Sequence, residues 1–340
     1  MADTVFTIFG ADDQVVATPS RITNALWSNG VGILDTFPFY TASGFESASA
    51  TGNSRYYCDI YYGDPATEQV EFSIAYGHVS GAGAPSTDLD YPTKAIYGQY
   101  KNFLLDNANG QFILDTTGAT VSMSQFFAIS IKRANLKQKL DPGNWALHLS
   151  GSIQTGSLHL IDNSADGYDY NAGATARSYK VVSGSITGGQ VGTAIYGLVY
   201  PDYGVILLDP TTFSSPLSMS LNTGTTEWTA SVGAFNNIYS LFMAMTGSHY
   251  FAARSEERIS STHYFVRVKN QQYNYSTNPT FYSASDGTII QPAFYDDPQT
   301  FLTTVGLYND TNELLAVAKL SQPVTKGFDK EALIKVRLDF

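Results

Sequence analysis

The sequence contains a single cysteine, Cys58, in 340 residues, so no disulfide can form within the chain. It also lacks a long apolar run, because no stretch approaches the roughly 18 residues that a membrane-spanning helix needs. The first residues, Met1 to Thr4, show neither the basic nor the apolar segment of a secretory signal. We therefore expect a protein that has no membrane partner and is made and kept in a cytoplasm, or assembled into a structure built there.

Charged residues are also scarce. They make up 14% of the chain, against about 25% in an average soluble domain, whereas hydrophobic residues reach 43% and aromatic residues 14%. This composition excludes an intrinsically disordered chain, which needs low hydrophobicity and high net charge. Tyr, Phe, Thr and Val fit a half-buried pleated surface, so we expect a folded, mainly β protein. An uncharged, Tyr-rich surface suits either a protein with many contacts to partners or an ordinary β-sandwich.

The net charge of −11 includes no basic region that could follow a phosphate backbone. Residues 1–250 contain 10 Lys and Arg against 20 Asp and Glu, and residues 251–340 contain 9 against 10. We therefore expect no nucleic-acid partner. One local basic cluster is interpreted as a solvated turn or rim, with contact to an acidic partner as the alternative. It consists of Lys132, Arg133, Lys137 and Lys139.

Runs rich in Val, Ile, Thr and aromatic residues alternate with Gly, Pro, Asn and Asp over most of the chain. This alternation is typical of antiparallel sheets, so we expect a sandwich or a barrel-like fold. The last run is the clearest, because Ala332, Ile334, Val336, Leu338 and Phe340 fall on one face of a strand. The predicted strands cover residues 55–62, 69–76, 126–131, 145–149, 158–161, 179–186, 263–269, 301–308, 314–320 and 332–340, with a hairpin over 194–209 and a hairpin turn at 309–312.

Two segments show the spacing of a helix, and they predict two or so short amphipathic helices packed on the core. The first covers residues 92–106, with Thr93 as a candidate N-cap. The second covers residues 235–245. The residues that share a face are Ile96, Tyr100, Phe103 and Leu104 in the first segment and Phe235, Ile238, Leu241, Phe242 and Met245 in the second.

Residues 1–50 mix Gly, Ser, Thr and Pro with isolated aromatics and show little sustained periodicity. We expect them to form an extended N-terminal arm or docking segment. The remainder is expected to divide into a β-rich domain with one helix, residues 51–234, and a C-terminal helix plus β-rich domain, residues 235–340. No repeat of fixed period occurs, which disfavours solenoids and propellers.

Motifs for nucleophilic catalysis and phosphate binding are missing. Residues 184–188 contain two glycines and a serine, but the serine is at the wrong position for a nucleophile elbow. No G-x-x-x-x-G-K-[ST] phosphate loop occurs. The acidic pairs Glu256-Glu257 and Asp296-Asp297 are sequence neighbours, which point to opposite faces of a strand and make poor acid/base pairs. We therefore predict no catalytic residues and no enzymatic activity.

Candidate ligands for a metal or cofactor are equally sparse, and we assign no such site. The run from Asp162 to Asp169 resembles the start of a calcium loop, but Gly173 stands where the bidentate Glu belongs. We interpret the run as a solvated β-turn, with a weak calcium or sodium site as the alternative. Cys58 is expected to be a buried small apolar residue. Five histidines have no metal-binding spacing and are expected to form structural hydrogen bonds, with the second and third able to face each other on adjacent strands. They are His78, His148, His159, His249 and His263.

Several longer phrases resemble virion structural proteins of T4-like and of marine or cyanobacterial myophages, which are often placed with the baseplate. The most distinctive are residues 251–270 (FAARSEERISSTHYFVRVKN), 273–281 (YNYSTNPTF), 304–323 (TVGLYNDTNELLAVAKLSQP) and 330–340 (KEALIKVRLDF). Residues 38–45, 95–106 and 196–209 look like the same family, so the resemblance touches most of the chain.

This resemblance implies a virion location after assembly in the bacterial host cytoplasm, and no catalytic residues. The implied partners are other baseplate, tail or neck subunits, with the protein present in multiple copies. The expected function is a structural subunit of a tailed-phage virion, with the baseplate wedge as the first placement. The alternative is a receptor- or carbohydrate-binding β-protein of the tail, in which exposed Tyr side chains together with Trp27, Trp145 and Trp228 would stack on sugars and Asn/Asp loops would supply hydrogen bonds.

Overall fold

The structure, a computed structural model, confirms the predicted fold class. Among the residues that it describes, 53% are in strands and 16% are helical, and two of the four α-helices found there are seven residues or longer. It describes residues 7–28, 35–36, 41–42, 56–62, 69–83, 91–105, 110–116, 119–151, 157–164, 177–214, 216–217, 219, 221, 237–248, 250–276 and 278–340.

Each predicted strand overlaps an observed one, whereas β1, β2, β3, β6 and β7 were not predicted. The strands are β1 (Gln14–Ala25), β2 (Asp35–Thr36), β3 (Thr41–Ala42), β4 (Tyr57–Tyr61), β5 (Val70–His78), β6 (Phe112–Thr116), β7 (Ala119–Met123), β8 (Gln125–Ile131), β9 (Lys139–Ser150), β10 (Ser157–Asp162), β11 (Tyr179–Ser185), β12 (Gly189–Tyr200), β13 (Val205–Leu208), β14 (Phe251–Val268), β15 (Thr300–Tyr308), β16 (Leu314–Lys326) and β17 (Ala332–Asp339). The helices are α1 (Pro92–Leu104), α2 (Arg133–Leu136), α3 (Pro210–Phe213) and α4 (Asn237–Ser248), and short 3-10 turns cover Ala11–Asp13 and Pro292–Phe294.

The chain forms two compact units. The large unit is residues 21–257, and the small unit combines residues 1–20 with residues 258–340. Strands β1 and β14 pair with each other, and each continues from one unit into the other. This grouping differs from the expected division at residues 50 and 234, because pairing between strands at opposite ends of the chain leaves no local signal in the sequence.

The N-terminal segment differs from the expected arm over its described part. Residues 14–25 form β1, and Leu26 and Trp27 are almost fully buried in the core of the large unit. The indole Nε1 of Trp27 donates a hydrogen bond to the carbonyl oxygen of Phe251, at 3.1 Å. Residues 14–27 are thus built into the sheet and its core.

The sheet of the large unit curls back on itself. Its strands follow the order β14-β9-β10-β11-β12-β13-β8-β5-β4-β3, so six strands separate β14 from β5. Nevertheless the rings of Phe251 on β14 and Phe72 on β5 are edge-on, with centroids 5.4 Å apart. Trp27 lies against both rings, at 5.0 and 5.8 Å. These contacts bring two distant strands together and give the unit a barrel-like form.

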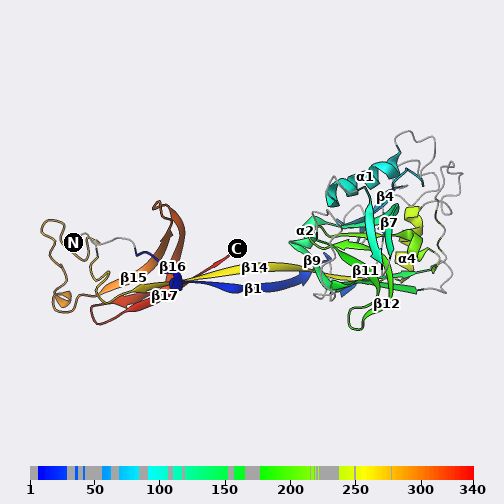
Figure 1. Cartoon of the computed structure of the whole chain (residues 1–340). Helices are drawn as coiled ribbons and strands as arrows, with labels where there is room; N and C mark the ends of the chain where they lie inside the picture. Colours follow the sequence, from blue (N-terminus) through cyan, green and yellow to red (C-terminus); the bar gives the residue numbers. More distant parts are fainter. Residues whose placement is uncertain are drawn as a thin grey trace. The chain divides into compact units, whose positions relative to one another are not determined.

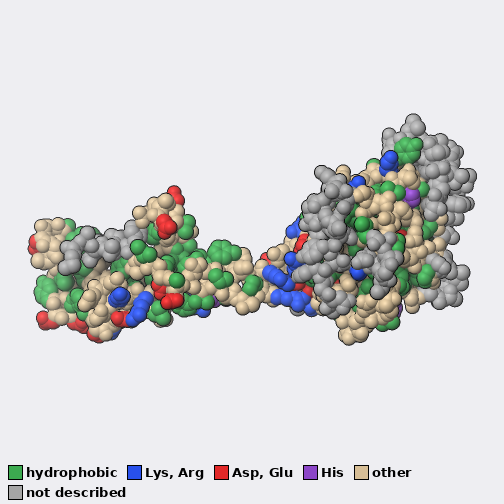
Figure 2. Space-filling view, in the orientation of Figure 1, with side chains coloured by type: hydrophobic (Ala, Val, Ile, Leu, Met, Phe, Trp, Pro, Cys, Tyr) green, Lys and Arg blue, Asp and Glu red, His purple; other side chains and the backbone are tan. Residues whose placement is uncertain are grey.

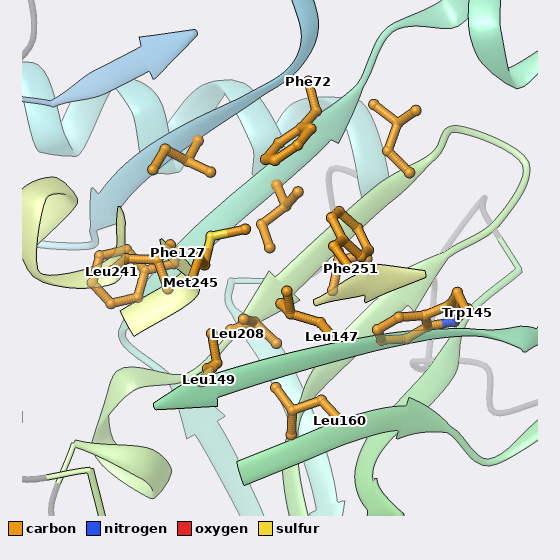
Figure 3. Close-up of a cluster of buried hydrophobic side chains, with 14 of the residues drawn as sticks. Phe72, Phe127, Trp145, Leu147, Leu149, Leu160, Leu208, Leu241, Met245 and Phe251 are labelled. Atoms are coloured by element: carbon orange, nitrogen blue, oxygen red, sulfur yellow. The ribbon is translucent and has the colours of Figure 1, made fainter. Parts of the chain in front are cut away.

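Helix α4 contributes to the interior of this curled sheet. Its residues Ile238, Leu241 and Met245 are buried in the main core, and Figure 3 shows Leu241 and Met245 beside Phe127 of β8. The predicted helix over residues 235–245, with one apolar face in the core, is confirmed at Ile238, Leu241 and Met245. Phe235, the first residue of the predicted stripe, lies outside the described residues.

A second apolar layer covers the outside of strands β5, β8, β13 and β12. It is formed by α1 and the β6–β7 hairpin, and Figure 1 shows α1 on the outer side of the sheet. Tyr97 of α1 stacks on Phe126 of β8 at 5.2 Å. The expected N-cap was wrong: α1 begins at Pro92 after Tyr91, and the Thr93 hydroxyl donates to the Ala82 carbonyl.

The small unit packs the β15–β16 hairpin against β14 and β17. Its inward side chains are Tyr264, Val266, Leu302, Val305, Leu307, Ala316, Ala318, Leu320, Ile334, Val336 and Leu338. The predicted alternation of the last strand is confirmed, since Ala332, Ile334 and Val336 are buried. Phe340 departs from it, because it follows the end of β17 and is exposed.

A buried lysine fastens the end of β16 to the loop that follows β14. The Lys326 ammonium donates to the carbonyl oxygen of Asn270, to Oδ1 of Asn274 and to the carbonyl oxygen of Gly327, at 2.7 to 2.9 Å. Burial lowers the pKa of Lys326. All three ammonium donors are satisfied, so this contact orders residues 270–274.

The burial of Trp27 gives a first prediction. Replacing Trp27 by Ala should lower the free energy of unfolding by about 3–5 kcal/mol, because it leaves a cavity between Phe72 and Phe251. Urea denaturation followed by circular dichroism measures the change. Val16→Ala, an exposed position of the same segment, is the matched control and should change stability little. Equal effects of the two substitutions would mean that residue 27 is not part of the core.

Candidate interaction surface

Five charged side chains form a network on three adjacent strands of the large unit. The Asp141 carboxylate on β9 has no exposed surface and accepts hydrogen bonds from Arg21 on β1 and Arg254 on β14. The buried Glu256 carboxylate on β14 is 3.5 Å from Nε of Arg21 and 3.7 Å from Nζ of Lys139. Each buried carboxylate therefore lies between two cations, which compensates for its desolvation.

This network corrects the interpretation of the basic cluster. Lys139 is buried and paired with Glu256, whereas Arg133 and Lys137 are exposed around α2 as expected. The Glu256-Glu257 pair behaves as expected for a strand, since Glu256 is buried and Glu257 is only half-buried. The sequence did not indicate that Asp141 or Glu256 would meet these cations, because their partners come from strands far apart in the chain.

Three aromatic rings stack on the β9–β10 pair. His148 lies directly opposite His159 in the strand register, as expected, and their ring centroids are 3.7 Å apart. Tyr250 stacks on the other side of His148, at 3.9 Å. Burial and the nearby charge of His159 lower the pKa of His148 to about 4. Parallel stacked rings do not aim their nitrogens at a common metal ion, so the stack is structural.

The calcium-like run begins inside the structure rather than in solvent. Asp162 is buried, and its carboxylate accepts hydrogen bonds from the backbone N–H groups of Gly143 and Ser164, at 2.8 and 2.9 Å. Residues 165–176 lie outside the described ranges. Across the ranges that are described, no group of three or more His, Cys, Asp or Glu side chains is placed to hold a metal ion.

Two further buried polar side chains, Tyr76 and Asp209, have structural hydrogen-bond partners. The Tyr76 hydroxyl donates to Oε1 of Gln125 at 2.6 Å, and Asp209 caps α3 by accepting from the N–H of Thr211 at 2.9 Å. Burial raises the pKa of both Tyr76 and Asp209. Burial likewise raises the pKa of the Cys58 thiol, which is buried as expected.

The small unit has far more exposed than buried apolar side chains. It contributes 17 of the 25 exposed large hydrophobic residues that the described ranges contain, but only 6 of the 55 buried hydrophobic residues. Figure 2 shows hydrophobic side chains spread over the visible face of this unit. A folded monomer rarely exposes so much apolar surface without a partner to cover it. This surface is therefore the candidate functional site.

Part of the exposed surface is the outer side of the β15–β16 hairpin, here called the hairpin face. It comprises Gly306, Tyr308, Leu314, Leu315 and Val317. Val317 is opposite Gly306, and the Tyr308 ring lies across the glycine, where a Cβ would be 2.9 Å from the ring. The absence of a side chain at Gly306 thus leaves room for the Tyr308 ring and the Leu314 side chain. The nearest charge on this side is Lys319, opposite Thr304.

The tryptophans do not form such a surface. Trp27 and Trp145 are only 3% and 0% exposed, so neither can stack on a sugar, and Trp228 lies outside the described residues. Exposed tyrosines are present in the small unit instead, including Tyr275 and Tyr295.

None of the helices in the described ranges combines the length and apolar character that a membrane crossing requires. Comparisons with protein-family models, with curated proteins and with solved structures found no match to this chain.

The charge network gives a second prediction. Asp141→Asn should lower the free energy of unfolding by about 3 kcal/mol, because Arg21 and Arg254 lose the carboxylate between them. Glu331→Gln, which breaks the exposed pair with Arg267, is the matched control and should cost about 1 kcal/mol at most. Urea denaturation of both variants measures the two changes in the free energy of unfolding. An equal, small loss in each would show that the buried network does not stabilise the fold.

The stacked rings give a third prediction. The folded-state pKa of His148 is about 4, below the ordinary value of 6.5. Between these values the unfolded chain binds more protons, so the stability that His148 contributes is lost as pH falls from 6.5 through about 4.

His148→Phe keeps a ring in the stack but removes the titration. The melting temperature of this variant should therefore fall less than that of the wild type between pH 7 and pH 4.5. Tyr250→Phe keeps both histidines and serves as the control, with the wild-type pH dependence. An unchanged pH dependence in His148→Phe would contradict the assignment.

Proposed function

We propose that this protein is a non-enzymatic structural subunit of a tailed-phage virion, in the baseplate wedge or another tail or neck component. It acts by binding other virion subunits. The observation that supports this proposal most strongly is the small unit, which exposes 17 large hydrophobic side chains and buries six hydrophobic residues within the described ranges.

The energetics of a unit this size favour a covered surface. Small folded units are stabilised mainly by the apolar area they bury. The small unit has about 100 residues but few buried apolar side chains, so its own free energy of unfolding is expected to be low. Covering the exposed side chains with protein supplies the missing burial at about 25 cal/mol per Å². A subunit of a larger assembly has neighbours that cover its exposed apolar side chains, whereas an independent module does not.

The position of the family resemblance supports the same proposal. Residues 251–270, 304–323 and 330–340 carry its most distinctive phrases, and they form β14, β15, β16 and β17. The segments that resemble myophage structural proteins are thus the strands that build the exposed surface. Placement in a virion and identity of the neighbours rest on this resemblance.

A receptor- or carbohydrate-binding role is the second candidate. It is weakened by the burial of Trp27 and Trp145, but exposed Tyr275 and Tyr295 in the loops between β14 and β15 keep an aromatic platform available. Specific binding of the isolated protein to members of a glycan array would favour this role.

The fourth prediction tests the virion assignment. Mass spectrometry of purified tailed particles from cells that express the chain should detect the protein, and cryo-EM of the particles should place it in the tail or neck. In the reconstruction the small unit should be covered by neighbouring subunits. Absence from the particles would contradict the proposal, and a peripheral position with the small unit exposed to solvent would favour receptor binding.

A further inference from the structure

The hairpin face places a specific requirement on whatever covers it. Its side chains are Tyr308, Leu314, Leu315 and Val317 beside Gly306, all on the side of the hairpin that points away from the small unit's own core. Leu315 is 68% exposed and Val317 58%. Since the face contains no charge, its partner must also present an apolar surface without charges, because an unpaired charge buried there is strongly unfavourable.

The chain itself supplies such a surface. We propose that the hairpin face binds the same face of another copy of this chain, so that the small unit is a self-association module. This inference deepens the proposed function and rests on it, since it names the partner at the assembly surface. A contact between identical patches needs no second surface to evolve and is the common geometry of homo-oligomers.

Charge distribution favours association through this unit. The large unit contains 11 Lys and Arg against 19 Asp and Glu, whereas the small unit contains 8 against 11. Two copies that met through their large units would therefore bring together most of the negative charge of both chains. Contact through the small unit, whose charges are nearly balanced, avoids this repulsion.

The size of the face indicates how far the contact extends. The face takes three residues of β15 and four of β16, which lie side by side. Four extended residues span about 14 Å, which with a width of about 10 Å gives roughly 140 Å². A stable interface buries about 800 Å² on each partner, so the hairpin face can be only its centre. The exposed Phe301 of β15, next to the inward Leu302 and so on the outer side of its strand, is available to extend it.

The fifth prediction tests the self-association with the full-length chain. Analytical ultracentrifugation of the wild type at micromolar concentrations should show dimers or larger oligomers. In the variant Leu315→Glu with Val317→Glu, like charges face each other, and the dissociation constant should rise at least about 100-fold. The control is Val121→Glu with Val191→Glu, on exposed strand positions of the large unit, which should associate like the wild type.

A charge-swap mixture separates loss of contact from misfolding. The variant Leu315→Lys with Val317→Lys should be monomeric alone but should associate with the Glu variant, because opposite charges then face each other. Circular dichroism should show wild-type folding for every variant.

The inference is overturned if the wild type is monomeric, if the Glu variant associates like the wild type, or if the mixture does not associate. The proposed function is tested separately. A wild type that is monomeric alone but present in tailed particles would overturn self-association and keep the virion role.

Discussion

The position of the Asp141 carboxylate is the constraint on which the rest of the large unit depends. Removed from water on β9, it is stable only because Arg21 and Arg254 reach it from β1 and β14. These ion pairs tie the N-terminal strand to β14 and to β9 beyond it, and Trp27, two residues past the end of β1, packs between Phe72 and Phe251.

Local patterns in the sequence predicted much of the fold, because strand alternation and helical stripes are properties of neighbouring residues. The last strand, the hairpin over residues 194–209 and the face of α4 were all predicted in this way. The pairing of β1 with β14 was not, since nothing near residues 14–25 shows which strand will accept them. Thr93 illustrates a smaller limit: a threonine near a helix start has the chemistry of an N-cap, but here its hydroxyl has a carbonyl partner in another loop.

The sequence predicted that the protein has a surface for contacts with partners, but not which residues form it. Low charge and many aromatic residues indicated a protein that contacts partners, but not which side chains remain exposed. On β15 the register with β16 shifts between Leu302 and Thr304, and the inward side chains change from Leu302 to Val305 and Leu307. Alternation counted from the two ends of β15 therefore assigns opposite faces. Consecutive Leu314 and Leu315 add to the ambiguity, because both are exposed although a regular strand would bury one of them. Only the three-dimensional packing of the hairpin separates its inner from its outer side.

The hydrogen bond between Trp27 and Phe251 also has a consequence for the order of the folding steps. The two residues are 224 positions apart in the sequence, and the sheet closes only when both are present. During synthesis, Trp27 and Arg21 leave the ribosome before β14 has been made. Their contacts with Phe251 and Glu256 of β14 therefore cannot form until late in synthesis. Such a high contact order slows folding. Closure of the large unit is therefore a late step, and a chain truncated before β14 has no route to the native core.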